Sequence, residues 1–150
     1  MDKPRYDEAQ WPILLVTMPE AELNAAELGD HLDRMSSFSK RGEPFAQVID
    51  VRTATSLSAH SRRLVAERMD QDQEAYPGVL VGVAIVLSTP LQRGIFKAIS
   101  WLSRKPRPFE AFSDLEEAMT WARRLIAVPT HSLTLQIAAD VTKQVRHAGR

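Results

Sequence analysis

Short apolar runs alternate along the chain with longer segments in which apolar residues recur at helical spacing. The apolar runs predict strands at residues 11–19, 45–51, 80–89 and 108–112. The run that begins at Leu80 is apolar on both of its alternating faces, which is typical of a central strand covered by helices on both sides. The intervening segments predict helices over about 20–41, 58–76, 90–105 and 115–126.

Residues that start or stop helices support these boundaries. Gly42 follows the first helical segment and supplies a stop. Ser58 is a natural N-cap for the second helix, and Pro90 suits the first turn of the third. Ser113 and Glu116 have the spacing of a capping box, which places the start of the fourth helix.

The order of these elements defines the expected fold class. Strands that alternate with helices predict an α/β domain with a four- to five-stranded, mostly parallel or mixed sheet and helices on at least one face. Residues 1–127 hold all of these elements without a linker, so we expect one domain. In the tail, 128–150, apolar residues lie four positions apart from Leu133 to Val145. The tail is either a last amphipathic helix or a frayed end.

The amino-acid composition limits the classes of partner and the cellular compartment that we expect. The 150 residues contain 19 lysines and arginines against 19 aspartates and glutamates, a balance that argues against neutralising nucleic-acid phosphates. Cysteine is absent, which excludes disulfides and thiolate metal sites and suits a reducing cytoplasm. The N-terminus does not resemble a secretory signal, and no apolar run approaches the ~20 residues that span a bilayer. We therefore expect a soluble, cytoplasmic protein.

Evidence for an enzyme is weak. Asp50, Ser58, His60 and Ser61 are residue types of a hydrolase triad, but the Gly-x-Ser-x-Gly elbow that would expose the nucleophile is missing. The four histidines are widely spaced, which disfavours a metal site, and no glycine-rich phosphate loop is present. We therefore expect neither catalysis nor a bound metal or cofactor.

The segment after the second predicted strand is the first candidate binding site. Asp50 ends an apolar run, and α/β sheets place ligand sites at the carboxyl ends of parallel strands. The favoured alternative is that its carboxylate caps the loop or pairs with Arg52, Arg62 or Arg63 and serves only the turn. Ser58 and Ser61 are candidate phosphorylation sites, because a phosphate there would meet a helix N-terminus and Arg62. The alternative is that Ser58 only caps the helix.

A basic surface on the third predicted helix is the second candidate site. Arg93, Lys97, Trp101 and Arg104 share one face, roughly opposite the apolar stripe. A tryptophan among basic residues can anchor a protein partner or lie at an anionic membrane surface. The alternative is that Trp101 folds into the core. Single-stranded nucleic acid would require more aromatic residues among the basic ones, so we expect no nucleic-acid partner.

Three segments carry a resemblance to a known family. The passages "PFAQVIDVRTATSLSAHSRRL", "VGVAIVLS" and "FEAFSDLEEAMTWARRL" resemble SpoIIAA-like, or STAS-like, domains over about residues 11–127. That family contains bacterial anti-sigma-factor antagonists and sulfate-transporter tails. The resemblance implies a STAS/SpoIIAA-like fold and a non-enzymatic role in bacterial signalling. In signalling members a Ser or Thr in the loop after the acidic strand is phosphorylated, and alignment on Asp50 puts Ala59 at that position.

The function that we predict from the sequence is regulatory protein–protein contact with an unidentified regulatory protein. The predicted partner surface consists of Asp50, Ser58, His60, Arg62, Arg93, Lys97, Trp101 and Arg104. A homodimer could form through the tail or through an exposed sheet edge. The alternative function is a small-molecule or lipid-binding module with peripheral membrane contact.

Overall fold

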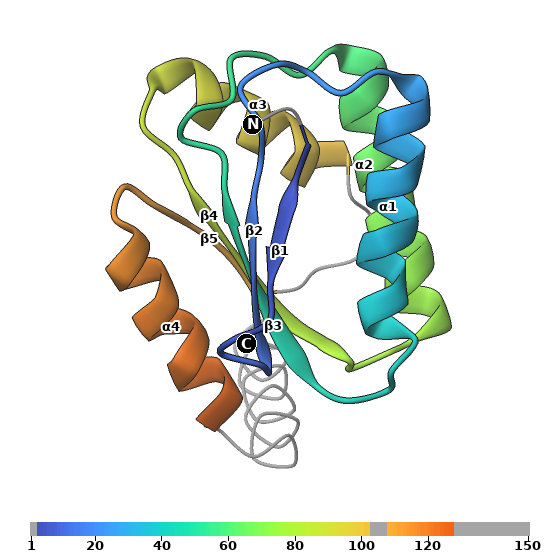
Figure 1. The fold of residues 1–150 in the computed structure, drawn as a ribbon, viewed down its shortest axis with the longest axis vertical. Helices are drawn as coiled ribbons and strands as arrows, with labels where there is room; N and C mark the ends of the chain where they lie inside the picture. Colours follow the sequence, from blue (N-terminus) through green and yellow to red (C-terminus); the bar gives the residue numbers. More distant parts are fainter. Residues whose placement is uncertain (1–2, 103–107, 128–150) are drawn as a thin grey trace, which may run out of the picture.

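A computed structural model describes residues 3–102 and 108–127 (Figure 1). Along the chain, its elements are β1 (Arg5–Asp7), β2 (Ile13–Thr17), α1 (Ala25–Ser39), β3 (Phe45–Asp50), α2 (Ala59–Ala75), β4 (Leu80–Val86), α3 (Pro90–Leu102), β5 (Phe109–Phe112) and α4 (Leu115–Ala127).

The strands form one mixed sheet in the order β1-β2-β3-β4-β5. The pairs from β2 to β5 are parallel, and β1 adds an antiparallel edge. This arrangement confirms the α/β class and the mostly parallel or mixed sheet. The sequence did not predict β1, because three residues are too few to display an alternating pattern.

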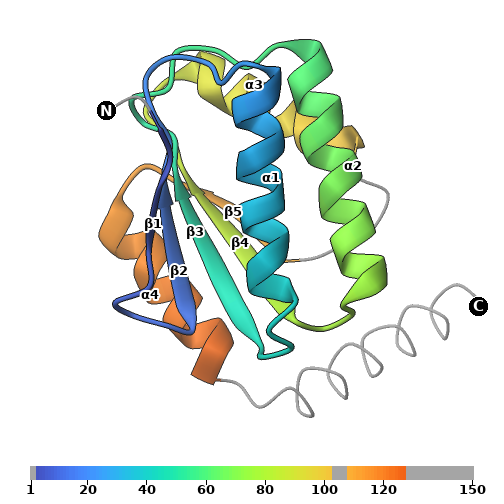
Figure 2. The same cartoon turned by 45° about the vertical axis from the view of Figure 1, so that its right-hand side comes forward.

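Helices cover the sheet unequally on its two faces. Figures 1 and 2 show α4 on one face and α1, α2 and α3 on the other. The α4 side is tightly packed: Ala118, Met119 and Ala122 are buried against Ala84 and Val86 of β4, an inner strand that lies between β3 and the edge strand β5. Small side chains on both surfaces let this helix approach the sheet closely.

On the opposite face the described core is divided into separate clusters. One cluster is formed by Leu14 of β2, Phe38 near the C-terminal end of α1 and Phe45 at the start of β3. Leu23 and Leu32 belong to a second cluster near the start of α1. Between these clusters the three helices do not fill the space above the sheet, and this gap is where the candidate site lies.

Two helix starts differ from the predicted positions. The first helix was expected from about residue 20 but begins at Ala25, because Asn24 and Glu27 form a reciprocal capping box. At α4 the cap is one residue later than predicted: the Asp114 carboxylate, not the Ser113 hydroxyl, accepts the amide hydrogen of Glu117 at 3.2 Å. The predicted tail helix lies outside the described residues. Within the described part of the chain, no helix has the length and apolar content to cross a membrane.

Candidate functional site

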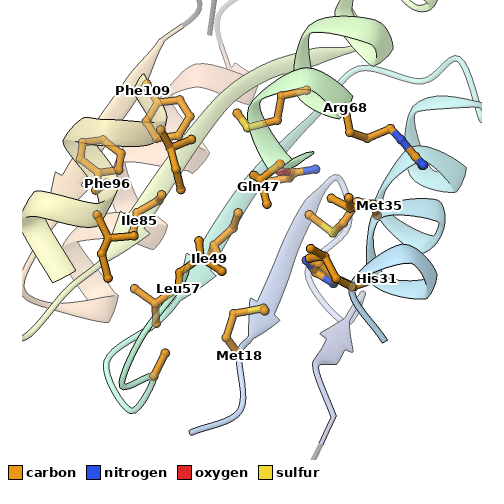
Figure 3. A pocket seen from close by; sticks show the side chains of 18 of the residues that line it. Met18, His31, Met35, Gln47, Ile49, Leu57, Arg68, Ile85, Phe96 and Phe109 are labelled. Atoms are coloured by element: carbon orange, nitrogen blue, oxygen red, sulfur yellow. The ribbon is translucent and has the colours of Figure 1, made fainter. Parts of the chain in front are cut away.

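A cavity of about 410 Å³ lies between the sheet and helices α1, α2 and α3 (Figure 3). Small-molecule sites in proteins typically have volumes of ~300–1,000 Å³. Its wall is mostly apolar and includes Met18, Leu32, Met35, Ile49, Ile85 and Phe96. The loop after β3 contributes Ala54, Ser56 and Leu57, so the first predicted binding segment forms part of the cavity wall.

Gln47 places an amide on the apolar floor of this cavity. The side chains of β3 alternate, so Ala46 and Val48 face α4 whereas Gln47 faces α1–α3 (Figure 3). Its neighbours in register are Leu14 on β2 and Val83 on β4, and both are fully buried. Only 6% of Gln47 is exposed, and the structure gives its side chain no hydrogen bond to any described residue.

His31 projects from α1 on the opposite wall of the cavity (Figure 3). Its Nδ1 forms a 2.6 Å hydrogen bond with the Tyr6 hydroxyl of the edge strand. Burial disfavours the imidazolium and lowers the pKa of His31 to about 4. Burial also raises the pKa of Tyr6, although the nearby Arg34 guanidinium opposes that shift. The pair is therefore uncharged near neutral pH and anchors β1 to α1.

Where α1 meets α2, the Arg68 guanidinium of the cavity wall is paired with an acidic residue. The Arg68 Nη1 donates to the Asp33 carboxylate at 2.8 Å and to the Ser36 hydroxyl at 3.3 Å. Ser36 in turn donates to the two carboxylate oxygens of Asp72, at 2.9 and 2.8 Å. Because Arg68 is already paired with Asp33, it leaves little positive potential for a further anion.

Asp50 ends β3 as predicted, but its carboxylate serves the turn. Both of its oxygens are held by the Arg52 guanidinium, at 3.0 and 2.8 Å, and the Arg52 amide adds a 3.0 Å bond. Burial raises the pKa of Asp50, but the hydrogen bonds from Arg52 outweigh it and hold the pKa below its ordinary value. The described hydrogen bonds do not join Asp50 to His60, so no triad is assembled.

The N-terminus of α2 brings the two candidate phosphorylation sites together. Ser58 is exposed and is the N-cap: its hydroxyl accepts the Ser61 amide hydrogen at 3.2 Å. Ser61 is only 8% exposed. Glu22 accepts the Ser58 amide hydrogen at 2.5 Å, and that bond lowers the Glu22 pKa. The carboxylate of Glu22 therefore already occupies the anion position at this helix end, and the Arg62 guanidinium donates to the Leu57 carbonyl at 2.8 Å.

A second buried glutamine, Gln92, fastens the loop after β3 to α3. Its Nε2 donates to the carbonyls of Val51, Arg52 and Ala54 at 2.8, 3.1 and 2.9 Å. Its Oε1 accepts the Ser88 amide hydrogen at 2.7 Å. This side chain fixes the loop that forms part of the cavity wall.

The basic face of α3 is solvent-exposed, as predicted. Trp101 is 81% exposed, so the alternative in which it folds into the core is wrong. Arg93 and Lys97 are also exposed, whereas Arg104 lies outside the described residues. The aromatic ring that α3 sends inward is Phe96, which packs on Phe109 of β5 with ring centroids 4.8 Å apart. Trp101 remains part of a candidate contact surface.

The structure therefore separates the predicted site residues into two groups. Asp50, Ser58, His60 and Arg62 lie on or beside the loop after β3, whereas Arg93, Lys97 and Trp101 lie on α3. Sequence reasoning missed Gln47, His31 and Arg68, which line the cavity. The signal was present for Gln47, since a polar residue interrupts an inward-facing strand pattern. No group of three or more His, Cys, Asp or Glu suited to a metal occurs among the described residues.

These elements define an α/β domain whose four parallel strands direct their loops to one edge of the sheet. No protein-family model and no curated protein matches the sequence. An uncharacterised Shewanella loihica protein with a SpoIIAA-like fold matches with a TM-score of 0.56 and 19% identity, over 79% of this chain and 91% of that one. The anti-sigma factor antagonist SpoIIAA, in its unphosphorylated form, matches with a TM-score of 0.58 and 16% identity, over 80% of this chain and 97% of that one. The chain has a STAS/SpoIIAA-like fold, which confirms the family resemblance at the level of the fold.

Proposed function

We propose that the protein is a non-enzymatic binding module that holds an apolar small molecule between the sheet and helices α1–α3. The observation that carries this proposal is the cavity of about 410 Å³ with its largely apolar wall. Filling such a space with a ligand restores the dispersion contacts that its lining residues lack. The sequence alone favours regulatory protein contact over small-molecule binding. The cavity is the observation that favours small-molecule binding.

Binding of the neutral dye Nile red to the full chain tests this proposal. We expect saturable fluorescence enhancement with one site per chain, because the dye is apolar and the cavity is within the size range of small-molecule sites. Ile49→Phe enlarges a side chain of the cavity wall and should abolish the enhancement. Arg63→Ala, at an exposed position of α2, is the control and should bind like the wild type. Absence of saturable binding to the wild type contradicts the proposal.

Regulatory protein contact is the second candidate function. It is supported by the likeness to an anti-sigma factor antagonist and by two exposed features, the loop with Ser58 and the α3 face with Trp101. Because this loop also lines the cavity, a bound molecule would alter the surface offered to a partner.

Affinity capture from the native cell tests the second candidate. Ser58→Asp puts a carboxylate beside Glu22, and Trp101→Ala removes the largest exposed apolar side chain of α3. Each variant should reduce capture of one specific protein, whereas Lys3→Ala, at an exposed site, should not. If both variants retain full capture, these surfaces are not the partner site.

A further inference from the structure

The Gln47 amide and the charge balance of the cavity together indicate what kind of ligand it takes. Gln47 stands near the middle of β3, between Leu14 and Val83 in register, and is flanked along its own strand by Phe45 and Ile49. All four neighbours are apolar. The fully buried polar atoms without a partner among the described residues do not include those of the Gln47 amide, so this amide is accessible from the cavity, where a ligand could pair with it.

Gln92 shows what a structural glutamine looks like in this protein. Both glutamines are 6% exposed. The Gln92 side chain donates to three backbone carbonyls and accepts from Ser88, so its hydrogen-bonding capacity is used within the chain. Gln47 has none of these bonds to described residues, and its side chain lies in the cavity (Figure 3). The difference points to a partner that the described residues do not supply.

We infer that Gln47 is the recognition group of the cavity, and that the ligand is an uncharged amphiphile whose hydroxyl or amide group pairs with the Gln47 amide while its apolar part fills the remaining space. This inference rests on the proposed function. An amide offers both donors and an acceptor, and hydroxyl and amide groups can pair with both.

The charges around the cavity disfavour an anionic ligand such as a fatty acid. Among the described residues, the charged side chains that line it are Glu22, Arg68 and Asp72. Arg68 is paired with Asp33, and Asp72 accepts two bonds from Ser36 beside it. Arg68, the cation among these described side chains, is thus already paired, and a carboxylate bound beside it would lose its hydration without gaining an unpaired cation from the described part of the wall.

An NMR titration of the isotope-labelled full chain with octanol, octanamide and sodium octanoate at neutral pH tests the inference. The three probes share their apolar chain and differ in the head group. We expect octanol and octanamide to bind roughly tenfold or more tightly than octanoate, since the buried head group decides the difference. The side-chain NH₂ signals of Gln47 should shift on binding, and those of Gln92 should shift much less.

The variant Gln47→Leu extends the test, because leucine has a similar volume and no polar atoms. It should weaken octanamide binding roughly tenfold. If Nile red binds but octanoate equals or exceeds octanamide, or the Gln47 NH₂ signals do not move, the inference is wrong and the proposed function stands. If neither Nile red nor any octyl probe binds, both are wrong. If Gln47→Leu does not fold, the inference is tested by the wild-type protein alone, through its relative affinities for the three octyl probes and the shifts of the Gln47 NH₂ signals.

Discussion

At the scale of single residues, two buried glutamines play opposite roles. Gln92 uses its amide to hold the backbone of the loop after β3, whereas Gln47 faces the cavity without a bond to a described residue. A polar group that a fold uses fully contributes to stability, and one held ready for a ligand lowers it until the ligand binds. Stability measurements without ligand can therefore separate the two roles.

Replacing each glutamine by leucine should change the free energy of unfolding in different directions. Gln92→Leu leaves the carbonyls of Val51, Arg52 and Ala54 without their donor, and we expect a loss of about 2 kcal/mol or more. Gln47→Leu removes an amide that faces the cavity without a hydrogen bond to a described residue, and we expect no loss or a gain of about 1 kcal/mol. Urea denaturation without ligand measures both. A large loss from Gln47→Leu would mean that its amide is structural.

The buried His31 should make the free energy of unfolding depend on pH. Its pKa is about 4 in the folded protein, against ~6.5 in an unfolded chain, so between these values the unfolded state binds more protons. The stability that comes from keeping His31 neutral is fully present above about pH 6.5. As the pH falls toward 4, up to about 3 kcal/mol of the free energy of unfolding is lost. Urea denaturation at intervals from pH 7 to 4 should show this loss in the wild type.

The variant His31→Gln should flatten that pH dependence, because glutamine keeps a hydrogen-bonding group near the Tyr6 hydroxyl but does not titrate. His60→Gln, on the exposed first turn of α2, is the matched control for removing an imidazole. A His31→Gln variant that loses as much stability as the wild type on acidification would show that this histidine does not carry the effect.

At the scale of elements, the close contact of α4 with β4 depends on Gly82. A Cβ atom built there would collide with the Leu125 side chain and lie 3.2 Å from Trp121. Gly82→Val should therefore lower the free energy of unfolding by about 1–3 kcal/mol. Gly29→Ala is the control: it lies in α1 with open space around its Cβ position, and it should raise that free energy by about 0.5–1 kcal/mol. Thermal denaturation compares the two, and an unchanged Gly82→Val would refute the tight α4 packing.

The sequence predicted these elements well because their signals are local. The run from Leu80 predicted an inner strand with helices on both faces, although β3, not this strand, is the central one, and Ser58 and Pro90 marked the helix starts that the structure shows. The α4 cap was wrong by one residue because Ser113 and Asp114 are adjacent residues that can both cap a helix, and side-chain geometry decides between them. The short edge strand β1 had no local signal, since it is held by pairing with β2 and by the Tyr6–His31 bond.

At the scale of the whole molecule, the two faces of the sheet have different tasks. The α4 face is closely packed with small side chains. On the other face, the cavity lies between the sheet and α1–α3, and the loop that Gln92 holds forms part of its wall. A hydrophobic pattern states which face of a helix is buried, but not how far the helix stands from the sheet. The cavity, and with it Gln47 as a site residue, therefore could not be predicted from periodicity alone.

The most direct test of the account locates a bound amphiphile by intermolecular nuclear Overhauser effects between octanamide and the full chain. If the molecule lies between the sheet and the helices, its chain protons should show effects to Met35 on α1 and simultaneously to the methyl groups of Ile49 and Ile85 on the sheet. Effects confined to Leu91 and Leu102, the exposed leucines of α3, would place the amphiphile on the surface and contradict the account.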